Sequence, residues 1–162
     1  MTDEEIYKKW KSLTPDLRYL RPKRWEQIKE VIQSNNLNSI IEFGSGISTI
    51  LFDNLGLHIV SYETSGKFIS FVKPLCSPKV KFIKWNNRGL YITKRYDLAL
   101  IDGILPRIPQ LEAISGHSRF YAIDDFDRCI ARESLPFIKP LKRVDNQSTI
   151  LAIFEDTLYA RG

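Results

Sequence analysis

Short apolar runs that alternate with longer mixed segments constrain the fold of this chain more than any other feature of its sequence. Each run has four to six residues and is rich in Ile, Val, Phe and Tyr, a composition typical of strands buried on both faces. The runs are Ser39–Phe43, His58–Tyr62, Lys79–Lys84, Tyr96–Ile101, Phe120–Ile123 and Thr149–Phe154. Because the segments between them can form helices, the alternation predicts a mostly parallel sheet covered by helices.

The first 38 residues are expected to be helical. Pro22 suits the first turn of a helix, and Trp25, Ile28, Val31 and Ile32 recur at spacings of three or four. This helix would lead directly into the first strand. Further helices are expected at Ile47–Leu55, Gly66–Leu75 and Ile108–Ser115.

Two connections depart from a regular alternation of strands and helices. Residues 85–95 join the third and fourth strands, and a crossover usually needs at least about ten to twelve residues including its helix. We therefore expect a single helical turn there, or none. Near the C-terminus, the runs Leu141–Val144 and Thr149–Phe154 flank the polar segment Asp145–Ser148, which predicts a hairpin and an antiparallel pair at one edge of the sheet.

The composition excludes several classes of protein. With 162 residues, 43% of them hydrophobic and 27% charged, the chain can bury a core without disulfides and is neither disordered nor fibrous. No segment without a charged residue, including Phe43–Phe52 with ten residues and Val31–Ile41 with 11, approaches the length of about 20 residues that a membrane helix needs. The acidic N-terminus does not resemble a secretory signal, so Cys76 and Cys129 are expected to be free thiols in a soluble, cytoplasmic protein.

Eight basic residues and no acidic residue lie between Thr64 and Tyr96. This segment is either a surface for nucleic acid or another polyanion, or the solvated face of a basic protein with a formal net charge of +5. No zinc-finger, helix-turn-helix or aromatic-rich RNA-binding pattern accompanies the charges, which favours the solvated face. The eight residues are Lys67, Lys73, Lys79, Lys81, Lys84, Arg88, Lys94 and Arg95.

Glycine and polar residues follow five of the predicted strands. In an open parallel sheet, ligands bind beyond the carboxyl ends of the strands, so these residues are expected to share one site. In strand order they are Gly44, Ser45 and Gly46; Glu63; Asn86 and Asn87; Asp102 and Gly103; and Asp124 and Asp125.

Each of these positions also has a purely structural interpretation. Gly44 and Gly46 permit a tight turn, and the same lack of a Cβ lets a ligand approach the backbone. Glu63 is an ordinary acid at a strand end or, 17 residues after Gly46, an acceptor of hydrogen bonds from ribose hydroxyls. The aspartates after the fourth and fifth strands cap the next turn or helix, or they bind a ligand. The joint pattern favours a site.

Histidine chemistry is not expected at this edge. The two histidines, His58 and His117, precede the second and fifth strands, as Cys76 precedes the third, so all three fall at the opposite edge. Cys129 falls on the site side without a histidine partner. This arrangement excludes a histidine general base, a Ser-His-Asp triad and a Cys-His pair. The chemistry would rest on carboxylates, a metal ion or the positioning of reactants.

The segment Ile41–Thr49, an acidic residue followed by Gly-x-Gly, resembles the first motif of the class I S-adenosylmethionine-dependent methyltransferases. The resemblance runs from Trp25 to Phe154. It implies that the glycine-rich turn holds the methionine portion of the cofactor, that Glu63 binds the ribose, and that residues after the third strand contact adenine. The implied cofactor-binding residues are Glu42, Gly44, Ser45, Gly46, Ser48, Thr49, Glu63, Asn86, Asn87, Asp102 and Gly103.

The segment Tyr96–Arg128 also resembles small methyltransferases of undefined substrate and the metal-dependent catechol and macrocin O-methyltransferases. In the latter, one aspartate after the fourth strand and an acidic pair after the fifth hold magnesium. The resemblance therefore assigns Asp102, Asp124 and Asp125 as catalytic residues and Mg²⁺ ligands; the alternative is capping and cofactor contact.

Three departures from that family limit what the resemblance implies. The helix between the third and fourth strands is reduced or missing, which would open part of the adenine pocket. No catalytic lysine can be placed, and no insertion could serve as a lid. Substrate binding would then fall to the N-terminal segment or to a partner subunit, which makes a homodimer plausible. The N-terminal candidates are Tyr19, Arg21, Arg24 and Trp25.

The sequence thus predicts a single α/β domain over residues 1–162, with a helical segment at 1–38 and a three-layer Rossmann-like core at 39–162. The expected function is S-adenosylmethionine-dependent methyl transfer to an oxygen of a small molecule. One alternative is a non-catalytic methyltransferase-like module, which could bind nucleic acid through the basic segment. A nicotinamide-dependent oxidoreductase is disfavoured, because Thr49 stands where the dinucleotide pattern requires Gly or Ala.

Overall fold

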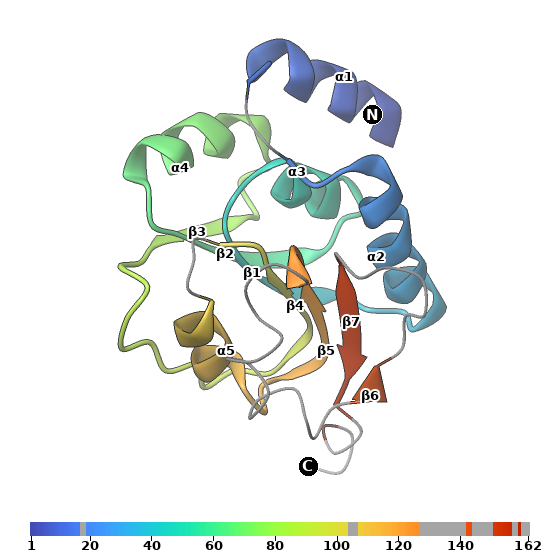
Figure 1. Ribbon diagram of the computed structural model, residues 1–162. Helices are drawn as coiled ribbons and strands as arrows, with labels where there is room; N and C mark the ends of the chain where they lie inside the picture. The colour runs from blue at the N-terminus through green and yellow to red at the C-terminus, as the bar shows by residue number, and fades with distance from the viewer. Residues whose placement is uncertain (17–18, 104–106, 127–141, 144–150, 157–158, 160–162) are drawn as a thin grey trace.

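The computed structural model describes residues 1–16, 19–103, 107–126, 142–143, 151–156 and 159. These residues form a seven-stranded sheet with the order β3-β2-β1-β4-β5-β7-β6 (Figure 1). Strands β1 to β5 pair in parallel, and β7 runs antiparallel to both β5 and β6. The predicted α/β class, with a mostly parallel sheet and an antiparallel C-terminal edge, is confirmed.

The strands form where the apolar runs predicted them. The third strand begins two residues later than its run and the fifth begins two residues earlier. The antiparallel pair expected near the C-terminus is present, but its predicted turn, Asp145–Ser148, lies outside the described residues. The strands are β1 Ser39–Phe43, β2 His58–Glu63, β3 Lys81–Lys84, β4 Tyr96–Ile101, β5 Ser118–Ile123, β6 Lys142–Arg143 and β7 Ala152–Glu155.

Helices cover both faces of the sheet and give the fold three layers (Figure 1). Helices α1 to α4 pack over one apolar cluster and α5 packs over a second cluster on the opposite face. Residues 85–95 contain no helix, as expected from the short connection. The helices are α1 Asp3–Leu13, α2 Pro22–Ser34, α3 Ile47–Asn54, α4 Gly66–Val72, the 3₁₀ turn η1 Lys73–Leu75, and α5 Ile108–Ile114.

The N-terminal segment forms two helices that are joined by a partly buried polar link. The Asp3 carboxylate accepts hydrogen bonds from Trp25 Nε1 at 2.8 Å and from Lys29 Nζ at 2.7 Å. At the other side of α1, the buried ring of Trp10 packs edge-on against Phe71, with ring centroids 5.7 Å apart. Helix α1 is therefore held between α2 and α4, beside the carboxyl ends of the strands.

The opposite edge of the sheet carries the residues that the sequence placed there. His58 begins β2, and His117 directly precedes β5. Cys76 is a free cysteine just before β3, whereas Cys129 lies outside the described residues. None of the described helices combines the length and apolar character that spanning a membrane requires.

Candidate functional site

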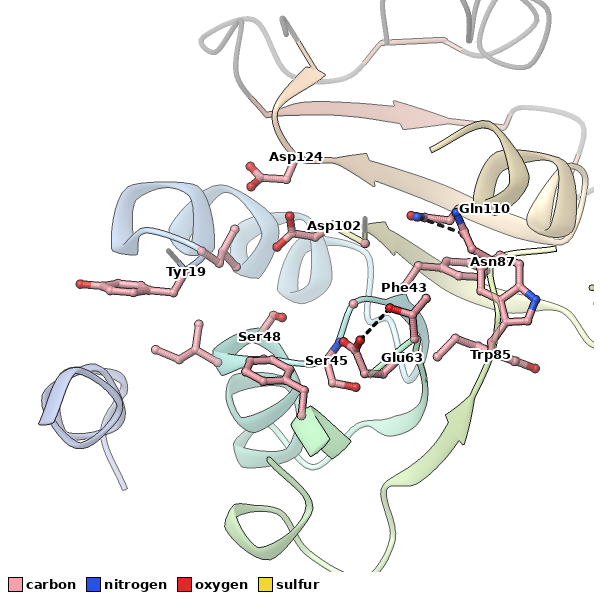
Figure 2. A pocket seen from close by; sticks show the side chains of 18 of the residues that line it. Tyr19, Phe43, Ser45, Ser48, Glu63, Trp85, Asn87, Asp102, Gln110 and Asp124 are labelled. Atoms are coloured by element: carbon pink, nitrogen blue, oxygen red, sulfur yellow. Dashed lines mark hydrogen bonds between the residues drawn. The ribbon is translucent and has the colours of Figure 1, made fainter. Parts of the chain in front are cut away.

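A cavity of about 310 Å³ opens where β1, β2, β4 and β5 end (Figure 2). Most of the predicted cofactor-binding and catalytic residues line it: Gly44, Ser45, Gly46, Ser48, Glu63, Asn87, Asp102, Gly103 and Asp124. The remaining predicted residues, Glu42, Thr49, Asn86 and Asp125, are not part of the lining. Because the carboxyl ends of the parallel strands lie at one edge of the sheet, they bring together residues as far as 80 positions apart in the chain.

The turn between β1 and α3 requires glycine at its first position. Gly44 has a φ of +100°, and a Cβ there would lie 2.7 Å from the backbone oxygen of Asp102. The turn therefore packs directly against the end of β4. Gly46 is different, because a Cβ at this position would meet nothing within 4 Å. Gly46 thus leaves space beside the cavity that a ligand can approach.

Glu42 lies beneath this turn and is fully buried. Its carboxylate accepts hydrogen bonds from the hydroxyls of Ser48, of Thr49 at 2.5 Å and of Ser61 at 2.8 Å. Burial raises the pKa of Glu42 to about 7, although the three hydroxyls oppose the shift. Its structural role is to fasten the first turn of α3 to the strands.

Glu63, at the end of β2, faces the cavity with a carboxylate that the backbone holds in place. It accepts hydrogen bonds from the backbone N–H of Ser45 at 3.0 Å (Figure 2) and from that of Ser65 at 2.8 Å. These bonds join the glycine turn to the end of β2. The oxygens that face the cavity keep lone pairs with which to accept further hydrogen bonds.

One wall of the cavity is aromatic. Phe43 stacks on Tyr62 with ring centroids 5.5 Å apart, and Trp85 lies 5.4 Å from Phe43. Asn87, at a φ of +61°, and Gln110 of α5 place amide groups beside these rings (Figure 2). This combination of flat rings and amides suits a planar heterocycle with hydrogen-bonding edges.

Asp102 and Asp124 lie on the opposite side of the glycine turn from this wall (Figure 2). The buried guanidinium of Arg107 donates to the backbone oxygens of Ile101, Gly103 and Asp124 and lies 3.4 Å from the Asp102 carboxylate. Burial and the neighbouring Asp124 carboxylate raise the pKa of Asp102 well above its usual range, against the effect of Arg107. Arg107 therefore ties the ends of β4 and β5 together.

Arg24 of α2 reaches the same aspartates from the helical layer. Its Nη1 lies 2.6 Å and 2.7 Å from the two carboxylate oxygens of Asp124 and 3.3 Å from Asp125. Burial raises the pKa of Asp124, and Arg24 opposes the increase. Two arginines thus neutralise most of the charge of the three aspartates.

The aspartates do not fit the Mg²⁺ site that the sequence resemblance implied. Asp124 and Asp125 share the Arg24 guanidinium, and Asp102 lies beside Arg107. Among the described residues, no group of three or more His, Cys, Asp or Glu side chains is placed to hold a metal ion. The next two residues of this segment, Asp127 and Arg128, lie outside the described residues.

The other N-terminal candidates have different surroundings. Tyr19, one of the residues expected to bind the substrate, lines the cavity. Arg21 is the exposed N-cap of α2. Trp25 is instead a core residue, 1% exposed, with its ring centroid 5.4 Å from that of Phe52.

Several lining residues were not singled out from the sequence: Trp10, Leu20, Tyr62, Thr64, Phe68, Trp85 and Gln110. Trp85 and Thr64 directly follow strands, so the rule that located Glu63 could have found them. No sequence signal brings Trp10 of α1 or Gln110 of α5 to the site, because their positions depend on helix packing. The eight residues of the basic segment are exposed and none of them lines the cavity.

Comparison with known proteins identifies the fold. No protein-family model and no curated protein sequence matches this chain. Among solved structures, a provisionally named caffeoyl-CoA O-methyltransferase from Staphylococcus aureus matches with a TM-score of 0.72 and 16% identity, over 96% of this chain and 92% of that chain.

Two further structures extend the likeness. A TehB-like SAM-dependent methyltransferase from Corynebacterium glutamicum has a TM-score of 0.62 and 14% identity, over 94% of this chain and 97% of that chain. The N-methyltransferase NodS from Bradyrhizobium japonicum has a TM-score of 0.58 and 13% identity, over 82% of this chain and 94% of that chain. The resemblance inferred from Ile41–Thr49 is thus confirmed at the level of structure: this chain has the fold of S-adenosylmethionine-dependent methyltransferases.

Proposed function

We propose that this protein binds S-adenosylmethionine in the strand-end cavity and transfers its methyl group to an oxygen of a small molecule. The observation that carries the proposal is the joint geometry of the glycine turn and Glu63. A turn that exposes its backbone, a fixed carboxylate and an aromatic wall line one cavity of about 310 Å³. That volume lies in the range of small-molecule sites, which is about 300–1,000 Å³.

The cavity offers a distinct environment to each part of the cofactor. The aromatic wall with Trp85 and the amides of Asn87 and Gln110 suits adenine. Glu63 would accept hydrogen bonds from the ribose hydroxyls. The open side of Gly46 would admit the methionine portion close to the backbone. The chain's residues therefore fit this cofactor.

The acceptor side is formed by Tyr19, Leu20, Asp102 and Asp124. Bound S-adenosylmethionine would supply an activated methyl group on a sulfonium. Holding the acceptor oxygen in line with that methyl is the main task of the protein, and correct positioning can lower a barrier by several kcal/mol.

Asp102 is the residue that we assign to proton removal. Its side chain is 26% exposed, which leaves the carboxylate within reach of a molecule in the cavity. The pKa of Asp102 is raised by burial and by the neighbouring Asp124, and a carboxylate with a raised pKa is a stronger base. Asp124 is 6% exposed and bound by Arg24, so its role is to shape the site and not to accept the proton.

Calorimetric titration with S-adenosylmethionine and S-adenosylhomocysteine tests the proposal. We expect binding at micromolar concentrations in the native protein and weaker binding in Asp102→Ala, since this residue lines the cavity. Glu30→Ala, which removes an exposed acid from α2, should bind like the native protein. Absence of binding to both compounds up to about millimolar concentration would refute the proposal, since that range covers the affinities typical of enzyme sites.

A further inference from the structure

The acidic cluster formed by Asp102, Asp124 and Asp125 meets positive charge that comes from the chain itself. Nη1 of Arg24 lies within 3.3 Å of oxygens from two different carboxylates. A single nitrogen that bridges two acids occupies the place that a bound cation would take between them. We infer that Arg24 replaces a divalent metal ion at this site, and that the acceptor side of the cavity works without one.

Burial makes this contact difficult for a metal ion to displace. The side chains of Arg24 and Asp124 are 17% and 6% exposed. An ion pair between desolvated groups is screened much less than a surface pair. Removing the guanidinium from its partners would leave two adjacent carboxylates without their counter-charge, and breaking a buried pair in this way is costly.

The remaining carboxylate of the cluster is also engaged. Arg107 lies 3.4 Å from Asp102 and is fixed by three backbone oxygens at the ends of β4 and β5. Two guanidiniums therefore face three carboxyl groups and offset most of their negative charge. A hard divalent cation prefers a site in which several carboxylates are free to coordinate it.

The backbone around Arg24 also keeps it in place. Trp25, the next residue, is buried and hydrogen bonded to Asp3, and Lys29 of the same helix pairs with Asp3 at 2.7 Å. Helix α2 is thus anchored at two positions that follow Arg24. The inference deepens the proposed function and rests on it only for what the site is used for. Whether the protein binds a metal ion can be measured separately from cofactor binding.

Titration with Mg²⁺ and Mn²⁺, followed by calorimetry and by the EPR signal of free Mn²⁺, tests the inference. The native protein should bind neither ion up to about 5 mM, which exceeds the range of weak oxygen-ligand sites. Arg24→Met keeps the aliphatic stem but removes the charge, and its affinity for Mn²⁺ should rise at least about tenfold as the carboxylates are released. Lys23→Met removes an exposed charge one residue away and should leave the titration unchanged.

Two results would overturn the inference. One is binding of Mg²⁺ or Mn²⁺ by the native protein that Asp124→Asn abolishes; this measurement decides the question even if Arg24→Met does not fold. The other is a folded Arg24→Met variant that binds no metal, because the guanidinium would then not be what excludes the ion. Titration with S-adenosylhomocysteine in EDTA separates the two proposals: lack of cofactor binding refutes the proposed function and leaves the metal result standing.

Discussion

At the scale of single residues, Glu63 gives the most direct test of how the cavity holds a cofactor. Its carboxylate accepts two backbone N–H groups and faces the cavity. In Glu63→Ala, calorimetry should show a loss of affinity for S-adenosylhomocysteine of about 10- to 100-fold, since hydrogen bonds to a charged group contribute about 1.5–3 kcal/mol. Glu112→Ala, on the exposed face of α5, is the matched control. Equal affinities for the two variants would contradict the assignment.

Glu42 predicts a pH dependence of stability. Its pKa is about 7 in the folded protein against 4.5 for the ordinary side chain, so folding takes up a proton between these values. The contribution of Glu42 to the free energy of unfolding is fully present below pH 4.5 and is lost as the pH rises to about 7. Urea unfolding should show that the free energy of unfolding of the native protein, relative to Glu42→Gln, falls by about 3 kcal/mol over this window. Parallel pH profiles would exclude a raised pKa.

Residue types and spacing predicted the glycine turn and Glu63, but they did not predict the ion pair of Arg24. Gly44, Gly46 and Glu63 could be located because each follows a strand, and strand ends can be recognised from local sequence. The ion pair of Arg24 with Asp124 joins residues 100 positions apart, so no local pattern reports it. The resemblance implied a magnesium site because the three aspartates were visible in sequence, whereas their contacts with Arg24 and Arg107 were not.

At the scale of secondary structure elements, Arg107 controls how β4 and β5 meet at the site. Its guanidinium donates to backbone oxygens that follow or end both strands. Arg107→Ala should lower the free energy of unfolding by about 3–5 kcal/mol, because it leaves a carboxylate and several carbonyls without a partner. Arg107→Lys should recover only part of the loss, since an ammonium lacks the planar fork. Chemical denaturation is the measurement, and a loss below about 1 kcal/mol for the alanine variant would contradict this role.

The bounds of two strands were predicted correctly from the extent of their apolar runs. The bounds of β1 and β4 coincide with their apolar runs because both strands are central and buried on both faces. The bounds shifted at the edge strand β3, whose two end residues are exposed, and at β5, which begins at Ser118, before its apolar run. The packing of α1 against α4 could not be predicted, since it depends on the contact of Trp10 with Phe71 across the fold.

At the scale of the whole molecule, the order of the strands predicts a gradient of local stability. Strand β4 lies between β1 and β5, and residues Leu98–Ile101 are fully buried, whereas β3 has one free edge within the described sheet. Amide hydrogen exchange should therefore be slowest in β4 and faster in β3. S-adenosylhomocysteine should slow exchange at Gly44–Gly46 in particular. Uniform exchange across the sheet, or no local change on addition of the ligand, would contradict this prediction.

The distribution of tryptophan gives the molecule a built-in optical reporter. Of its three tryptophans, Trp10 and Trp85 line the cavity from different elements, and Trp25 is buried in the core. A ligand that fills the cavity changes the polarity around two indoles, so the intrinsic fluorescence of the unlabelled protein follows occupancy directly. Because Trp85 belongs to the aromatic wall and Trp10 to the helical side, the variants Trp85→Phe and Trp10→Phe assign the signal to one part of the cavity. Libraries of methyl acceptors can then be screened by emission alone, before any turnover is measured.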